Sequence, residues 1–234
     1  MSNNYKNIVM MALLAVTTTG LLVTPPQASA QNLMQKAQAG DADARYRVAA
    51  NYYSGKGVQQ DMGQAFAFAR QAAAQGHAGA QAMLGIMYAQ GTGVEQDDYE
   101  AAHWYEQAAD QGDVDSQYMM GIYYATGAGV DLSFVDAAKW FAKVAEQGDA
   151  RGLTQLGYLF KTGQGVTESK VIAFALLTLS QANDPSASNK AVDFRKDLVA
   201  GMSPAQMEAG KQLSYELIKP NNFTNALKKA YSAL

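Results

Sequence analysis

Small, large and aromatic residues recur along most of the chain at helical spacing, in a pattern that repeats every 36 residues. In the first half of each unit, a small residue precedes a large apolar one by four positions, and an aromatic residue follows four positions later. Such an i, i+4, i+8 stripe predicts an amphipathic helix. The stripes are Ala44, Val48 and Tyr52; Ala80, Leu84 and Tyr88; Ser116, Met120 and Tyr124; and Gly152, Leu156 and Phe160. Small residues that should let a neighbouring helix approach closely stand beside them at Ala49, Gly85, Gly121 and Gly157.

A second helix is predicted in the other half of each unit. It begins at a residue type that favours the N-cap, because the side chain can accept a hydrogen bond from a free backbone amide. Small residues then precede large ones by three or four positions, which gives one buried face. The N-caps are Asp61, Asp97, Ser133 and Ser169. The two columns after the small residue hold Phe68, Trp104, Trp140 and Leu176, and then Ala69, Tyr105, Phe141 and Leu177. We expect both tryptophans in the core.

Glycine punctuates the repeat at two places. Gly-x-Gly-Val ends the first helix and Gln-Gly ends the second. Glycine tolerates the left-handed conformation with which a helix commonly ends, so both segments predict turns, and the valine is expected to fold back into the hairpin core. Two markers in register over a fixed period predict a stacked array of helix hairpins. The segments are 55–58, 91–94, 127–130 and 163–166, and the pairs end at Gly76, Gly112 and Gly148, with Asn183-Asp184 in the fourth place.

The order Ala-x-x-x-Leu-Gly-x-x-Tyr-x-x-Gly-x-Gly-Val, followed by Ala-x-x-Trp-Tyr-x-x-Ala-Ala-x-Gln-Gly, resembles the Sel1-like repeat, a relative of the tetratricopeptide repeat. The resemblance covers the units 41–76, 77–112, 113–148 and 149–184, and the first and fourth depart most from the pattern. It implies an all-α, right-handed α-solenoid and a bacterial envelope protein that binds other proteins without catalysis. A disulfide-rich branch of the family is linked with β-lactam binding, an activity that a chain without cysteine does not inherit.

The segments that flank the repeats are predicted to act as caps. Residues 31–40 resemble the last turns of a preceding second helix, which ends at Gly40. The repeat is lost after Asp184, and residues 185–234 predict a helical cap with a helix at 191–200. Another helix should start at Ser203-Pro204, where serine, proline and a glutamine three residues after the serine form a capping-box pattern. We expect the last stretch, 223–234, to be a weakly docked helix.

The first thirty residues have the form of a secretory signal peptide. Lys6 precedes an apolar run over residues 8–23, and Ala28-Ser29-Ala30 matches a small-x-small cleavage site. We predict cleavage after Ala30 and a periplasmic or secreted protein without stable membrane insertion. An uncleaved N-terminal anchor is the alternative.

The composition limits the classes of partner and the kinds of chemical site that the sequence can support. Without Lys6 the chain carries a net charge of about −4, which argues against nucleic acid or an anionic membrane surface as a partner. His77 and His103 have no second ligand at a metal-like spacing, and Asp97 among its acidic neighbours is interpreted as a helix cap. The glycine pairs follow helices rather than strands, unlike nucleotide-binding loops. We therefore predict no metal, no cofactor, no catalytic residues and a monomer.

A groove lined by the first helices is the predicted binding surface. The geometry of related arrays turns the third, sixth, tenth and thirteenth positions of each unit toward it, where tyrosine and isoleucine would form an interaction surface. The candidate partner-binding residues are Tyr46, Tyr53, Ile86, Tyr118, Ile122 and Tyr158. The other groove positions hold Asp43, Ala50, Gly79, Ala82, Ala89, Asp115, Ala125, Arg151, Thr154 and Lys161.

Two functions remain open at this point. The first is binding of a neutral to basic protein or peptide in the groove, as an adaptor, regulator, host-contact or toxin-immunity factor. The alternative is a carbohydrate-binding factor or an enzyme that acts on cell-wall material or polysaccharide, for which the tyrosines are the only support. It also remains open whether some of these tyrosines pack between repeats instead of lining the groove.

Overall fold

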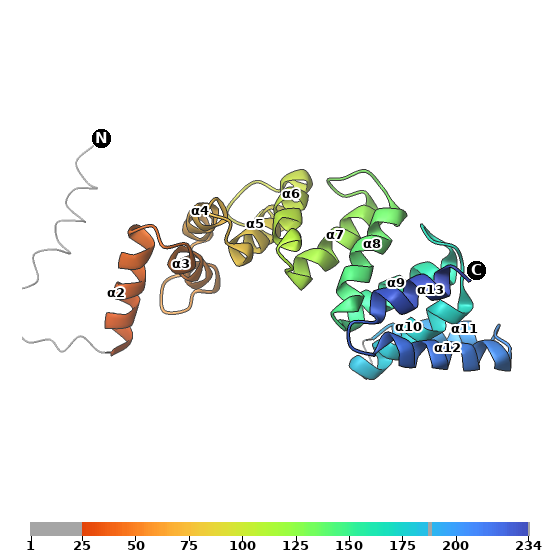
Figure 1. Cartoon of the computed structure of the whole chain (residues 1–234). Coiled ribbons are helices and arrows are strands. Elements are labelled where there is room, and N and C mark those ends of the chain that lie inside the picture. Colours follow the sequence, from red (N-terminus) through yellow and green to blue (C-terminus); the bar gives the residue numbers. More distant parts are fainter. Residues whose placement is uncertain (1–24, 187–188, 234) are drawn as a thin grey trace, which may run out of the picture.

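The structure, a computed structural model, describes residues 25–186 and 189–233. Within these residues it contains twelve helices and no strand (Figure 1). The helices are α2 (Pro25–Gln38), α3 (Ala42–Ser54), α4 (Met62–Ala73), α5 (Ala78–Gln90), α6 (Asp98–Asp110), α7 (Val114–Thr126), α8 (Phe134–Glu146), α9 (Ala150–Thr162), α10 (Lys170–Asn183), α11 (Ala191–Val199), α12 (Pro204–Leu217) and α13 (Phe223–Tyr231).

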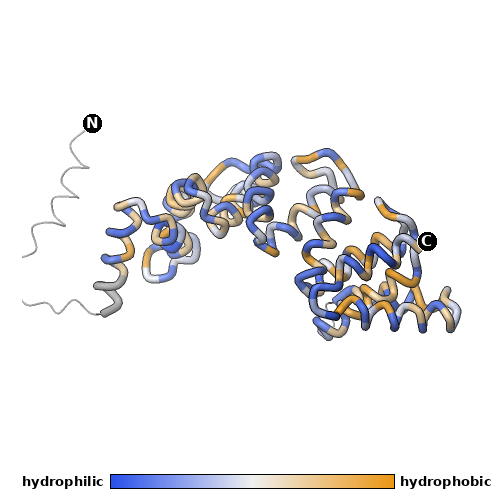
Figure 2. The backbone as a smooth tube through the Cα atoms, viewed as in Figure 1, coloured by the Kyte–Doolittle hydropathy of each residue, from blue (hydrophilic) through white to orange (hydrophobic). Residues whose placement is uncertain are grey.

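Four helix hairpins, α3–α4, α5–α6, α7–α8 and α9–α10, stack along an elongated array, and α9–α13 gather at its C-terminal end (Figure 1). Hydrophobic and hydrophilic positions alternate along the helices of this array (Figure 2). The second helix of each hairpin also packs against the first helix of the next one. The predicted all-α solenoid is confirmed.

The last three hairpins close where a glycine of the first helix meets a large residue of the second. A Cβ atom added to Gly85 would lie 2.6 Å from the ring of Tyr105, and one added to Gly121 would lie 2.4 Å from the ring of Phe141. Atoms cannot approach so closely, so glycine is required here for the helices to pack. The prediction that this column admits a neighbouring helix is confirmed.

The glycine turns join neighbouring repeats as well as the two helices of one repeat. The first glycine of each pair ends its helix in the left-handed conformation, as at Gly163 with a φ of 70°. The second glycine also has a positive φ, and in three of the four repeats it lies against the start of the preceding repeat's second helix. A Cβ atom at Gly165 would lie 2.3 Å from the backbone of Phe134. The pair therefore serves turn geometry and stacking together.

Two expectations about the core need correction. Val58, predicted to fold back into its hairpin, is 37% exposed, whereas the equivalent valines of the other repeats are half-buried. Trp140 is buried, but Trp104 is only half-buried. Val58 and Trp104 both lie in the first two repeats, where the packed side chains are smaller.

The C-terminal cap follows the prediction and extends the array. Ser203 and Gln206 form the expected capping box at the start of α12, and α13 is docked through buried Phe223. The sequence repeat stops at Asp184, yet α11 packs against α9 and α10, as the first helix of a fifth repeat would. Phe194 of α11 lies 36 residues after Tyr158 and contacts it.

The N-terminal helix α2 precedes the first hairpin and packs on α3. Among its described side chains, Leu33, Met34 and Ala37 join the hydrophobic cluster that contains Val48. Most of the predicted signal segment, residues 1–24, lies outside the described residues. Across the part of the chain that the structure describes, no helix combines the length and apolar character needed to cross a membrane.

Candidate partner-binding groove

A hollow of about 710 Å³ opens over α5, between α3 and α7. Small residues of α5, Gly79, Ala82 and Ala89, leave the space, and Tyr46 and Tyr118 stand on its two sides. We call it the central hollow. Its complete lining is Tyr46, Tyr53, Gly79, Ala82, Met83, Ile86, Ala89, Gln90, Tyr105, Asp113, Asp115, Ser116, Tyr118, Met119 and Arg151.

The six predicted binding residues divide between two environments. Tyr46, Tyr53, Ile86 and Tyr118 all line the central hollow, and Ile86 is 37% exposed. Ile122 is half-buried and packs against the C-terminal core cluster.

Tyr158 does not line the central hollow. It lies against Phe194 of α11, with ring centroids 5.0 Å apart, so the cap covers the groove at the fourth repeat. Thr154, another predicted groove position, is buried and hydrogen-bonds to Ser180 and Asn189 at 2.6 and 3.1 Å. Repeat four therefore contributes little to the open part of the groove.

Tyr46 and Tyr118 lie partly in the hollow and partly against the core. Tyr46 stacks on His77 with ring centroids 4.6 Å apart, and a Cβ at Gly79 would come within 3.0 Å of Tyr46 Cζ. The Arg151 guanidinium lies over the Tyr118 ring at 4.9 Å from its centroid, and the ring centroids of Tyr118 and Phe141 are 5.8 Å apart. Both tyrosines are half-buried, so they combine the two roles that the sequence left open.

The charged residues of the hollow are held in fixed contacts. Arg151 pairs with Asp115 and Asp149, each at 2.7 Å. The hydrogen bond from Arg151 holds the pKa of the Asp149 carboxyl below its usual value. The Asp113 carboxylate accepts a hydrogen bond from the amide of Ser116 at 2.8 Å and caps α7. The two carboxylates that line the hollow, Asp113 and Asp115, are thus engaged in structure, and their contacts do not resemble a pair poised for acid–base chemistry.

Sequence reasoning missed several residues of the hollow. Met83 and Met119 follow the predicted sixth position by one residue, and Gln90 follows the thirteenth. Ser116, buried with an unpartnered hydroxyl among the described residues, belongs to the small-residue stripe. A helix face wider than one stripe would have included them, because residues beside an exposed position share part of its surface.

A second, more polar hollow of about 390 Å³ adjoins the first across Tyr118 and Arg151. Because these two residues line both hollows, their stack forms a ridge between them. The remaining lining of this polar hollow is Ala150, Thr154, Gln155, Asp184, Asn189 and Lys190.

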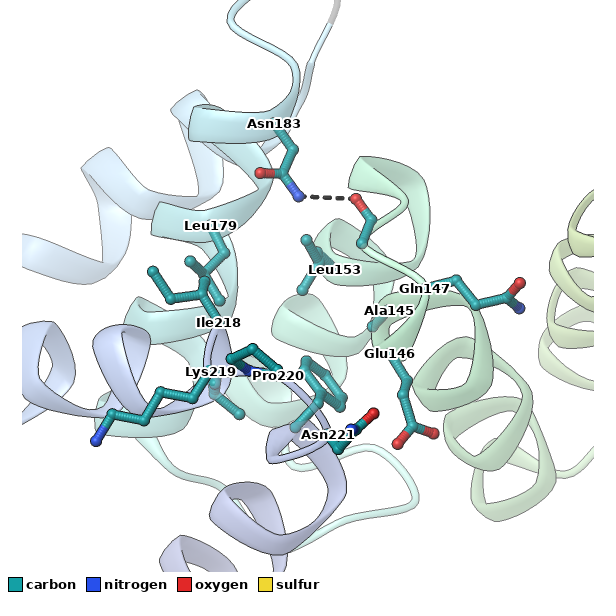
Figure 3. Close-up of a pocket in the computed structure, with 13 residues that line it drawn as sticks. Ala145, Glu146, Gln147, Leu153, Leu179, Asn183, Ile218, Lys219, Pro220 and Asn221 are labelled. Carbon is teal, nitrogen blue, oxygen red and sulfur yellow. Dashed lines mark hydrogen bonds between the residues drawn. The ribbon is translucent and has the colours of Figure 1, made fainter.

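A third cavity, of about 350 Å³, lies where the cap meets the last hairpins (Figure 3). Asn183 donates a hydrogen bond to the Gly148 carbonyl at 2.7 Å, and Thr224 of α13 donates one to the Glu146 carboxylate at 2.7 Å. Leu153 lines the cavity at the position where repeats two and three carry glutamine. The apolar residue thus replaces the glutamine at the place where the cap packs. The cavity is therefore explained by the packing of the cap against the last hairpins.

The two histidines lie in different environments, because His77 is half-buried and His103 is exposed. The His77 Nδ1 atom accepts a hydrogen bond from the Ala80 amide at 3.2 Å and caps α5. His103 is exposed beside Trp104. Among the described side chains, no three His, Cys, Asp or Glu residues gather in a way that could hold a metal ion.

The repeats of this chain match a known family of repeats. A family model described as Sel1 repeat matches residues 42–77, 78–113, 114–149 and 150–180. A search of curated proteins finds no match.

Several solved structures are similar to the chain, and two of them are described here. One is a protective antigen present in uropathogenic Escherichia coli strains that displays an SLR fold, at 30% identity and a TM-score of 0.64; the match covers 89% of this chain and 42% of that one. The other is a Sel1 repeat protein from Oxalobacter formigenes, at 32% identity and a TM-score of 0.65, which covers 73% of this chain and 49% of that one. The chain thus spans less than half the length of either protein.

Proposed function

Because the chain belongs to the Sel1 repeat family, whose members are generally protein-interaction modules, we propose that it binds a protein partner through the central hollow. Stacked helical repeats use their extended concave face for such binding. The observation that carries the proposal is the exposed gap between Tyr46 and Tyr118, which is floored by Ile86 and small residues of α5. Tyrosine and methionine are enriched at protein interfaces, and this hollow has both.

The proposed role is non-enzymatic. Asp113 caps a helix, and Asp115 pairs with Arg151. A carboxylate that acts as a general acid or base has to reach a proton of the substrate. Neither contact provides this arrangement. Sugar binding is the second candidate, and the tyrosines that line the hollow are its only support.

We place this function outside the cytoplasm, with the chain released after Ala30 and acting as a monomer. Leu33, Met34 and Ala37 of α2, which pack on the first hairpin, follow Ala30, so cleavage there would keep their contacts. The Escherichia coli relative is described as a protective antigen, a description that fits exposure outside the cell. Mass spectrometry of the protein from cell fractions should show Gln31 as the first residue. Recovery of an intact N-terminus would contradict the cleavage.

Site-specific photocrosslinking in living cells tests the binding proposal. A photoreactive phenylalanine analogue at Ile86 should capture one protein partner, whereas the same analogue at Ala209, exposed on α12, should not. Incubation of the purified chain with peptidoglycan tests the sugar alternative in parallel. Crosslinks of equal yield at both positions, or binding to peptidoglycan that Tyr46→Ala and Tyr118→Ala abolish, would contradict a protein-binding groove.

A further inference from the structure

We infer that the central hollow accepts one aromatic side chain from a basic segment of the partner. This inference rests on the proposed function and specifies its ligand. It follows from a gap in the tyrosine column, from the chemistry of the lining and from the charge at the rim of the hollow.

The gap arises because one repeat lacks a side chain that its neighbours have. Tyr46, Ala82 and Tyr118 occupy the same position in three successive repeats. The other groove positions of α5 are also small, apart from Ile86. A partner ring placed over Ala82 would therefore restore the column and lie between two tyrosines, where aromatic pairs gain energy beyond the area that they bury.

The remaining lining suits an apolar ring better than a polar group. Ile86 is 37% exposed, and Met83 and Met119 extend the apolar surface on either side. Methionine adapts its shape and makes favourable contacts with aromatic rings.

The charge at the α7 side of the hollow favours a basic neighbour. Asp115 and Asp149 both pair with one cation, Arg151, Asp113 lines the same side of the hollow, and the Asp115 side chain is 79% exposed. At the α3 side, the carboxylate of Asp43 is matched by Arg47 at 3.9 Å and can also meet His77. The excess of negative charge therefore lies beside Tyr118, where a lysine or arginine next to the inserted ring would complement it.

Peptide display with the complete mature chain as bait tests this ligand. A library of random heptapeptides should yield sequences with an aromatic residue next to lysine or arginine. Ala82→Tyr should weaken their binding at least about tenfold, because the new ring occupies the gap. The helix should tolerate this change, since two neighbouring repeats carry tyrosine at the same position. Ala209→Tyr on exposed α12 is the matched control and should leave binding unchanged.

The outcomes separate the two proposals. If no peptide is enriched, both the groove proposal and its ligand fail. If peptides are enriched but bind Ala82→Tyr as well as the unchanged chain, binding survives and the aromatic ligand is wrong. Enrichment of acidic peptides would overturn the charge argument. Ile86→Ser, which removes apolar floor without filling the gap, should also weaken binding and provides a second test if Ala82→Tyr unfolds the chain.

Discussion

The two ends of the solenoid bury their repeats in different ways. In the first two hairpins the core consists mainly of alanine, including Ala49, Ala69 and Ala80 around Leu84. In the fourth hairpin it consists of large residues such as Leu156, and α11–α13 add further side chains to it. Each buried methylene contributes about 0.8 kcal/mol, so the C-terminal end gains more from burial.

One position of the repeat shows directly that burial increases toward the C-terminal end. Phe68 and Trp104 are half-buried, whereas Trp140 is 9% exposed and Leu176 is fully buried. The groove changes in the opposite direction: it is open over small residues of α5 and covered by Phe194 at the fourth repeat. The repeats with the smaller side chains thus leave the proposed binding surface open, while the capped repeat buries more apolar side chains. In a stacked array each repeat depends mainly on its neighbours, which permits this division.

The largest expected effect on stability concerns the second glycine of each turn. In the fourth repeat this glycine contacts the neighbouring repeat, and in the first repeat it contacts nothing. Gly165→Ala should lower the free energy of unfolding by about 3 kcal/mol or more, because the new Cβ meets the backbone of Phe134 and φ is positive. Gly57→Ala has a similar positive φ but nothing within 4 Å, so it should cost only about 1–2 kcal/mol. Chemical denaturation measures both values. Equal losses would mean that the glycines serve turn geometry alone.

A smaller contrast concerns the tryptophans. Trp140→Ala should cost about 3–5 kcal/mol, as for other buried aromatic residues, and Trp104→Ala about 2 kcal/mol because its side chain is partly exposed. Lys143 lies over the Trp140 ring at 3.6 Å and adds to the difference. Denaturation of the two variants under one set of conditions decides the order. A larger loss for Trp104→Ala would show that the N-terminal repeats are the better packed end.

The sequence predicted the helices, their caps and their turns, because each depends on residues close together in the chain. N-caps such as Asp61 and the glycine turns follow from local hydrogen bonding and backbone freedom. The exposure of Val58 depends on which neighbouring repeat is present, and no local pattern contains that information. The covering of Tyr158 by Phe194 was missed for the same reason: α11 continues the 36-residue step with few of the residues that mark the repeat.

The candidate site was predictable in part. The repeat period placed Tyr46, Ile86 and Tyr118 on one face, and the structure brings them together around one hollow. The hollow itself exists because α5 carries small residues at its groove positions. Comparing the repeats position by position reveals the hollow only once the packing of neighbouring repeats is known.

The smallest expected effects test the division between an open and a covered groove. Ile86 and Tyr158 occupy the same position of repeats two and four, but only Ile86 faces the hollow. Ile86→Ala should change the free energy of unfolding by less than about 0.5 kcal/mol, since a surface position supports little core. It should weaken binding of an enriched peptide by about 1 kcal/mol or more, as interface side chains often do.

Tyr158→Ala should have the opposite effect. It removes the contact with Phe194 and leaves a void under α11, so we expect a loss of about 1–2 kcal/mol in unfolding free energy. Because the cap already covers this position, peptide binding should stay within about twofold of the unchanged chain, a difference of roughly 0.4 kcal/mol. Thermal melting and a peptide titration of both variants complete the test. If Tyr158→Ala weakened binding as much as Ile86→Ala, the cap would have to move aside when the partner binds, and the groove would extend through all four repeats.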